Sequence, residues 1–254
     1  MKSTQVMAEL DAMGSTERAA GMSRFFKTGP GQYGEGDRFI GVRVPDQRIV
    51  ARRFSSLSLK EIGRLLESLV HEHRLTGLLI LVEQFSRSES ATSQLEIVDF
   101  YLTHLERVNN WDLVDLSAPK ILGEHLLRCP DKRSVLFSMA QSANLWDRRI
   151  AVVATWPLIK QWQFEELMIL SKMLLTDSHD LMHKAVGWML REAGKVHLVV
   201  LEEFLEMYAG VMPRTMLRYA IERLASDRRR YFMERSGFHG KDTGRDSLGG
   251  GQHG

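Results

Sequence analysis

Apolar residues recur at three- and four-residue spacing along most of the chain, in segments of about 10 to 17 residues separated by short polar breaks. This periodicity is typical of amphipathic helices, and no segment has the alternation of a half-buried strand. The sequence therefore predicts an all-α fold. The expected helices cover residues 5–14, 15–27, 47–54, 59–73, 76–87, 91–107, 109–117, 119–128, 132–142, 146–160, 163–175, 179–193, 197–208, 213–225 and 227–234.

The polar breaks carry the residues that begin helices and form turns, as in Ser88–Ser90, Cys129–Asp131 and Thr176–Ser178. Helix pairs recur about every 35 to 45 residues without a strict sequence repeat, which favours a HEAT-like or ARM-like solenoid. We expect about six helix pairs with a concave face. A compact helical bundle is the competing architecture.

Two segments lie outside this helical pattern. Residues 28–39 are rich in glycine and are interpreted as a flexible loop, with neither the preceding strand nor the Lys-Ser/Thr of a phosphate-binding loop. Residues 236–254 are polar and glycine-rich, with little to bury, so we expect disorder. The predicted organisation is one domain over residues 1–235 followed by this tail.

Composition narrows the functional classes only slightly. Hydrophobic residues make up 44% and charged residues 26% of the 254 residues, an ordinary globular composition. The formal net charge is only +2, so nucleic-acid binding would require the 34 basic residues to cluster on one face. The single cysteine, Cys129, excludes an internal disulfide and suggests a reducing compartment.

The N-terminal segment has charges where a signal peptide would be apolar, and no apolar run approaches the roughly 18 residues of a membrane span. We expect a cytoplasmic protein that does not enter membranes.

The sequence HDLMH, from His179 to His183, places two histidines at the i, i+4 spacing of zinc ligands on a helix. Asp180 stands where metalloproteases have a longer glutamate, and no third ligand is evident. We therefore predict no metal site.

Trp111 and Asp115 are four residues apart in NNWDLVDLSAPKILG, so both side chains lie on one helical face. A structural interpretation is a core tryptophan beside a solvated or capping acid. An indole beside a carboxylate is also a candidate site, and later helices offer partners for it.

The first partner is NLWDRR, in which Arg148 and Arg149 project about 100° apart on a helix. One arginine can therefore face solvent while the other faces the same groove as Trp111. Two solvated arginines are the alternative.

The second partner is KAVGWMLRE, where Lys184, Trp188 and Arg191 form one helical stripe. A core stripe would be apolar at all three positions, whereas cations flanking an aromatic suit a phosphate and sugar surface. Gly187 within this helix indicates the close approach of a neighbouring element.

Basic residues are also concentrated between Arg214 and Arg235, where seven arginines against three acidic residues give a local net charge of +4. A solvated face would explain this run, and so would a patch that binds a phosphate backbone.

The motifs WDLVD, NLWDRR and KAVGWMLRE, in this order on tandem helix pairs, resemble the AlkD-type alkylpurine DNA glycosylases of the HEAT-repeat DNA alkylation repair family. The resemblance runs from about Met22 to about Ile221 and implies a concave DNA-binding face. In that family an aspartate between two tryptophans forms the active site, supported by an arginine. The resemblance assigns the catalytic positions to Asp115, Trp111, Trp188 and Arg149.

The resemblance also implies DNA-binding positions, which we assign to Arg149, Arg191, Lys184, Arg148, Phe25 and Lys160. Two residues depart from the family pattern. Phe25 stands where the best-known members have a tyrosine near DNA, which removes a hydroxyl. Pro157 stands where a lysine is expected, and Lys160 could partly replace it.

The function implied by the resemblance is hydrolysis of the N-glycosidic bond of cationic 3- and 7-alkylated purines in duplex DNA, without a cofactor and by a monomer. Asp115 would stabilise the oxocarbenium-like sugar and position water. A non-catalytic HEAT-like DNA-binding or scaffold protein is the alternative from another class. A relative that acts on other adducts or unusual DNA structures is a third hypothesis.

Overall fold

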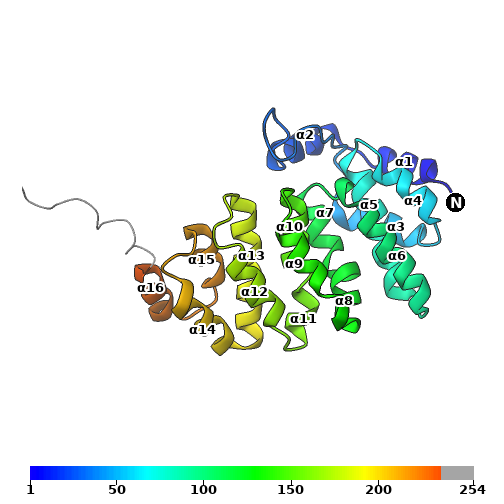
Figure 1. Cartoon of the computed structure of the whole chain (residues 1–254). Helices are drawn as coiled ribbons and strands as arrows, with labels where there is room; N and C mark the ends of the chain where they lie inside the picture. Colours follow the sequence, from blue (N-terminus) through cyan, green and yellow to red (C-terminus); the bar gives the residue numbers. More distant parts are fainter. Residues whose placement is uncertain (236–254) are drawn as a thin grey trace, which may run out of the picture.

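Two layers of helices stacked side by side form the molecule (Figure 1). The computed structural model describes residues 1–235, and the disordered tail expected at 236–254 lies outside them. Within the described residues there is no strand, only an isolated bridge between Arg38 and Val70. The predicted all-α fold is confirmed, and the arrangement is that of a solenoid of helical repeats.

One layer, the inner row, consists of helices that each pack against the next along the chain of repeats. Their apolar positions recur at helical spacing and are buried, as at Leu75, Leu78, Leu79, Val82 and Phe85 of one helix. The inner row comprises α3 (Val44–Arg53), α5 (His71–Arg87), α7 (Trp111–Ser117), α10 (Leu145–Val153), α13 (Asp180–Val196) and α15 (Arg214–Ala220).

The remaining helices pack around this row, with α4 and α6 against α5, α9 against α10 and α14 against α13. α2 and the loop that follows it lie above α7 and α10, in the middle of the row (Figure 1). These helices are α1 (Ser3–Ala12), α2 (Thr16–Phe25), α4 (Leu59–Leu66), α6 (Ala91–Thr103), α9 (Ser134–Ala140), α12 (Glu165–Met173), α14 (Leu198–Tyr208) and α16 (Ser226–Arg235).

Short helical segments continue or connect the longer ones. The π-helical segment η2 and then α8 follow directly after α7, and α11 follows α10. The short segments are η1 (Leu105–Arg107), η2 (Pro119–Gly123), α8 (Glu124–Arg128), η3 (Pro130–Lys132) and α11 (Trp156–Lys160). The sequence predicts separate helices at 109–117 and 119–128. In the structure the helical type changes between these two ranges, from α7 to the π-helical η2.

One predicted helix boundary is wrong. The sequence pattern ends a helix at residue 73, whereas the break lies at Glu67–Val70 and α5 begins at His71. The polar run His71–Arg74 resembles an exposed helix end, but all of its side chains are buried. Glu72, for example, accepts hydrogen bonds from the backbone N–H groups of residues 40–42 at 2.7–3.2 Å. These polar residues are core residues because a distant loop supplies their partners.

Two glycines set the spacing of the inner row. A Cβ atom on Gly187 of α13 would lie 2.5 Å from the Met216 carbonyl oxygen and 2.6 Å from the Tyr219 Cβ of α15. The close approach predicted at this glycine is confirmed. A Cβ atom on Gly123 would lie 2.4 Å from the Ala154 carbonyl oxygen, so the segment after α7 closely approaches the end of α10. Side chains on neighbouring inner helices are therefore held near one another.

Across residues 1–235, none of the helices combines the length and the apolar character needed to cross a membrane.

Candidate functional site

Side-chain caps determine where three inner helices begin. The Asn110 side chain accepts from the Trp111 backbone N–H at 2.8 Å at the start of α7, and Asn144 accepts from Trp146 at 3.0 Å at the start of α10. His179 caps α13 by accepting from the Leu181 backbone N–H at 3.2 Å. Such caps satisfy N–H groups that have no partner within the helix, and they fix which residue enters the first turn.

The residue at the fifth position of each of these helices is polar: Asp115 in α7, Arg149 in α10 and Lys184 in α13. Because these helices are adjacent in the inner row, the three side chains line one cavity of about 580 Å³. The complete lining is Phe25, Lys27, Tyr33, Trp111, Asp115, Arg149, Leu181, Lys184, Trp188, Arg191 and Tyr219.

Asp115 and Arg149 form a two-pronged ion pair. Arg149 Nε donates to one carboxylate oxygen of Asp115 at 3.0 Å, and its Nη2 donates to the other at 2.8 Å. The third nitrogen of Arg149 donates to the Leu181 carbonyl oxygen at 2.6 Å. The Arg149 side chain is 6% exposed and that of Asp115 is 15% exposed. The arginine therefore lies beneath the carboxylate, which is the more accessible partner.

The pKa of Asp115 is raised above its ordinary value. Burial is the largest cause, and the charge of Asp112 adds to it. The Arg149 guanidinium opposes the rise through its charge and its hydrogen bonds, which stabilise the ionised carboxylate. The Arg149 pair therefore favours the anionic form of the carboxylate and opposes the effect of burial.

Trp111 forms one wall of the cavity and is held by aromatic neighbours. The Phe26 ring stacks on it with centroids 5.1 Å apart, and Phe25 meets it edge-on at 5.9 Å. Phe26 also stacks on Phe39 at 4.9 Å. Packing of this kind restricts the indole to one orientation.

Trp188 lines the same cavity from α13. Its indole N–H donates to Glu192 at 3.2 Å, and Trp156 packs edge-on against its ring with centroids 5.5 Å apart. The structure thus brings Trp111, Asp115, Arg149 and Trp188 together around one cavity.

Tyr33, which the sequence interpretation missed, lies in the glycine-rich loop and lines this cavity. The Tyr33 hydroxyl donates to the Phe25 carbonyl oxygen at 3.5 Å, and the Tyr33 ring meets Trp146 edge-on at 6.1 Å. Burial is the main reason that the pKa of Tyr33 is raised. The signal in the sequence was an aromatic residue in the middle of a polar, glycine-rich segment, since such a side chain needs a surface to pack on.

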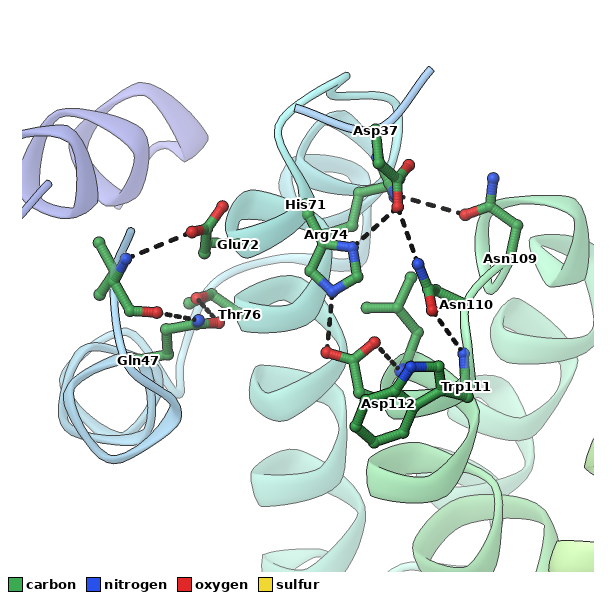
Figure 2. A network of polar contacts seen from close by, with 12 residues as sticks. Asp37, Gln47, His71, Glu72, Arg74, Thr76, Asn109, Asn110, Trp111 and Asp112 are labelled. Atoms are coloured by element: carbon green, nitrogen blue, oxygen red, sulfur yellow. Dashed lines mark hydrogen bonds and ion pairs between the residues drawn. The ribbon is translucent and has the colours of Figure 1, made fainter. Parts of the chain in front are cut away.

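The loop is anchored by a buried polar network shown in Figure 2. Asp37 accepts from Arg74 at 2.6 Å and from Asn110 at 3.1 Å, and it contacts His71 Nδ1 at 3.0 Å. The other ring nitrogen of His71 lies 2.8 Å from Asp112. The interpretation of this loop as a flexible connector is wrong, because the network joins its end to the first turns of α5 and α7.

His71 is a second cation of this network, beside Arg74. Burial alone would lower its pKa, but the charges and hydrogen bonds of Asp112 and Asp37 raise it to about 9. The imidazole therefore carries both ring protons at neutral pH and donates to a carboxylate on each side.

Two other predicted DNA-binding cations in the cavity already have acidic partners. Lys184 lies 2.7 Å from Asp180, and the hydrogen bond with Asp180 is the largest cause of the raised pKa of Lys184. Arg191 forms ion pairs with Glu222 and Glu192. The Nε of Arg191 is buried without a hydrogen-bond partner among residues 1–235.

The structure does not bring Arg148 or Lys160 to the cavity. Arg148 donates to Asp177 at 2.7 Å and to two backbone carbonyl oxygens. The Lys160 ammonium lies 4.4 Å above the centre of the Trp156 ring. Of the two predicted arginines of α10, Arg149 is thus the one that faces the cavity, although it binds a carboxylate there.

The two departures from the family pattern lie in different surroundings. Phe25 is 65% exposed at the rim of the cavity, where the nearby Tyr33 provides a hydroxyl. Pro157 is buried, and its ring would lie 2.9 Å from a Cβ on Gly123. This position therefore belongs to the packing between η2 and α11.

The histidines of HDLMH both serve the fold. His179 caps α13, as described above, and His183 Nε2 lies 2.5 Å from the Asp177 carbonyl oxygen. No group of three side chains able to hold a metal ion occurs in the described part of the chain.

Comparisons with known proteins agree with this architecture. A solved structure described as a predicted DNA alkylation repair enzyme from Enterococcus faecalis matches with a TM-score of 0.67 and 19% sequence identity, covering 84% of this chain and 98% of that chain. At this identity the similarity shows a shared fold. A search of curated protein sequences finds no match.

The family model described as DNA alkylation repair enzyme matches residues 6–224, which contain all the cavity-lining residues. The chain therefore belongs to the DNA alkylation repair enzyme family.

Proposed function

We propose that this protein is a DNA glycosylase that hydrolyses the N-glycosidic bond of cationic 3- and 7-alkylated purines in duplex DNA. The observation that carries the proposal is the Asp115 carboxylate, which lines one cavity together with Trp111 and Trp188 and is oriented by Arg149. Membership in a family of DNA alkylation repair enzymes supports alkylated DNA as the substrate.

The chemistry suits a single carboxylate. A purine alkylated at its 3- or 7-position is positively charged, so it leaves as a neutral base when the bond from C1′ to nitrogen breaks and the electron pair goes to the nitrogen. The positive charge then moves to the sugar as an oxocarbenium-like species. Water adds to C1′ and loses one proton. An anion beside C1′ stabilises the sugar cation and orients the water, and no strong general acid is required.

Each remaining residue of the cavity has a role in this proposal. The indoles of Trp111 and Trp188 present electron-rich faces to a developing cation and exclude bulk water. Arg149 is a positioning residue, because it fixes both oxygens of Asp115 and favours the anion. Its position beneath the carboxylate argues against the phosphate contact expected from the sequence.

The pairing of the cavity's cations weighs against a protein that only binds DNA. Three of the four cations that line the cavity, Lys184, Arg149 and Arg191, have an acidic partner, and the fourth, Lys27, lies over the Tyr33 ring. A phosphate-binding surface gains nothing from such acids, because they weaken the attraction for DNA. The arrangement suits a site in which an anion itself has a function.

The experiment is to incubate the protein with duplex DNA treated with a methylating agent and to separate the released bases by chromatography. The proposal predicts release of 3-methyladenine and 7-methylguanine faster than their spontaneous loss, and no release of bases from untreated duplex. A protein that binds the methylated duplex but releases neither base above the spontaneous rate would instead fit the DNA-binding or scaffold alternative.

A further inference from the structure

A second cleft, of about 500 Å³, lies between α15 and α16 and does not include Asp115. Three arginines line it, one from α15 and two from α16, and we call it the three-arginine cleft. Its full lining is Arg218, Ile221, Glu222, Ser226, Arg229, Arg230 and Met233. Ser226 is the first residue of α16, so the positive end of that helix also lies at the cleft.

The arginines of the C-terminal run fall into two groups. Arg228 pairs with Glu202 at 2.8 Å, Arg235 pairs with Glu206, and Arg214 donates to the Met233 carbonyl oxygen at 2.9 Å. These three side chains hold α16 and the start of α15 in place.

The cleft arginines, by contrast, are exposed. Arg218, Arg229 and Arg230 have no ionic partner among residues 1–235. The acid in the cleft, Glu222, is itself paired with Arg191. Three guanidinium groups that line one cleft without acidic partners repel one another, and an anion would relieve that repulsion.

The three-arginine cleft is joined to the Asp115 cavity by a groove. A hollow between the two is lined by Asp180, Lys184, Thr215, Arg218, Tyr219 and Glu222. It shares Lys184 and Tyr219 with the Asp115 cavity, and it shares Arg218 and Glu222 with the cleft. A ligand that enters the Asp115 cavity can therefore continue along α13 and α15 into the cleft.

We infer that the three-arginine cleft binds the phosphodiester backbone of duplex DNA on one side of the nucleotide held at Asp115. Guanidinium groups bind phosphate oxygens in a planar, two-pronged geometry, which suits successive phosphates of one strand. The middle of the groove has two acids next to two cations, so it offers little net attraction. The duplex is therefore bound at two places along the groove, with the target nucleotide at one end and flanking phosphates at the other. This inference rests on the proposed function only for the nucleotide at Asp115.

The test compares two triple variants with the same change in charge. One is Arg218→Ala, Arg229→Ala and Arg230→Ala. The matched control is Arg52→Ala, Lys60→Ala and Lys172→Ala, which removes three exposed cations that line neither the cleft nor the groove. Fluorescence anisotropy then measures affinity for an unmodified duplex over a series of KCl concentrations, and thermal melting verifies that both variants fold.

The cleft variant is expected to lower the slope of log affinity against log salt by about two to three, because each lost phosphate contact removes roughly 0.9 from the slope. The control should keep the slope of the parent. Equal slopes for the two triple variants would overturn the inference.

A second measurement locates the contact. Duplexes with one tetrahydrofuran abasic nucleotide are shortened on either the 5′ or the 3′ side of it, and Asp115→Asn provides the unreactive background. The cleft variant should weaken binding to one shortened duplex and have no effect on the other. Weakening of both would contradict a contact on one side. Neither measurement depends on base release, so failure of the proposed reaction would leave both results interpretable.

Discussion

Two aspartates three residues apart on α7 have opposite surroundings. Asp112 pairs with His71 of α5, and Asp115 pairs with Arg149 of α10. Both are mostly buried carboxylates that contact a buried cation from a neighbouring helix. Only Asp115 lines a cavity, whereas Asp112 lies in the closed network that also contains Asp37 (Figure 2). The two acids have the same charge and are both mostly buried. They differ in that Asp115 lines the cavity and Asp112 does not.

The two ion pairs also differ in which partner, the cation or the carboxylate, has a shifted pKa. In the closed network, which also holds the Arg74 guanidinium, the charges and hydrogen bonds of two carboxylates raise the pKa of His71 to about 9. In the open pair, one cation opposes the effect of burial on a single carboxylate, whose pKa remains raised. The first arrangement stabilises a fold that includes the glycine-rich loop. The second maintains a carboxylate with an open side, which is what a reaction at a sugar requires.

The largest expected effect is on stability. Asp112→Asn should lower the free energy of unfolding by roughly 3 to 5 kcal/mol, because it leaves the buried His71 cation with one carboxylate fewer. Asp115→Asn, the matched variant in the open pair, should cost less, since Asp115 and Arg149 line a cavity that water can enter. Urea unfolding of both variants measures the difference. Equal losses would mean that the two aspartates do not differ in the way described.

Next in size is the pH dependence of stability. The pKa of His71 is about 9 in the folded protein, against an ordinary value of 6.5. Its contribution is therefore complete below pH 6.5 and is lost as the pH rises through 9, a change of about 3 kcal/mol. Urea unfolding at a series of pH values should show this loss in the parent. His71→Gln should remove it, and a variant with the same alkaline loss as the parent would contradict the assignment.

A smaller effect, on activity, is expected at Arg149. Arg149→Ala should slow single-turnover base release by about 10- to 100-fold, which corresponds to the loss of a positioning contact of 1.4 to 2.7 kcal/mol. It should also move the acid limb of the pH–rate profile to higher pH, because the guanidinium that opposes the raised pKa of Asp115 is gone.

Arg148→Ala is the control for this prediction, since Arg148 is on the same helix but pairs with Asp177 away from the cavity. Its profile should coincide with that of the parent. If the acid limb shifts equally in both variants, Arg149 does not act through Asp115.

The smallest expected effect concerns the loop. Tyr33→Phe removes the hydroxyl that donates to the backbone of Phe25, whose ring packs against Trp111, and such a hydrogen bond is worth about 0.5 to 1.5 kcal/mol. Base release should therefore slow by roughly 2- to 10-fold. Tyr219→Phe, at the opposite edge of the cavity, is the control because no hydrogen bond of its hydroxyl supports a tryptophan. A greater loss in the control would argue against a role for Tyr33 in orienting Trp111.

The helical fold could be predicted because its determinants are local. Buried apolar positions at helical spacing, as in α5, and side-chain caps such as Asn110 are written in consecutive residues. Helical spacing is also local, and it predicts that Trp111 lies next to Asp115. It likewise predicts that Lys184, Trp188 and Arg191 share one face. These residues do meet in one cavity.

What the sequence could not predict depends on contacts between distant residues. The loop is fixed by Asp37 binding His71, 34 residues away, and this contact is also why the polar start of α5 is buried. The support of Asp115 by Arg149 was expected, but the expectation that Arg191 would bind a phosphate did not anticipate its acidic partner, Glu222. Side-chain pairing across helices determines which cations remain available, and helical periodicity does not contain it.

Single-turnover base release by Asp115→Asn, measured together with its affinity for the same methylated duplex, tests the central claim most directly. We predict that release falls by at least about 100- to 1000-fold, as expected when one preorganised electrostatic contact to the transition state is lost. Affinity should be kept or increased, because the variant removes a negative charge from a DNA-binding cavity. Release of methylpurines at the rate of the parent would contradict the assignment of Asp115 as the catalytic carboxylate.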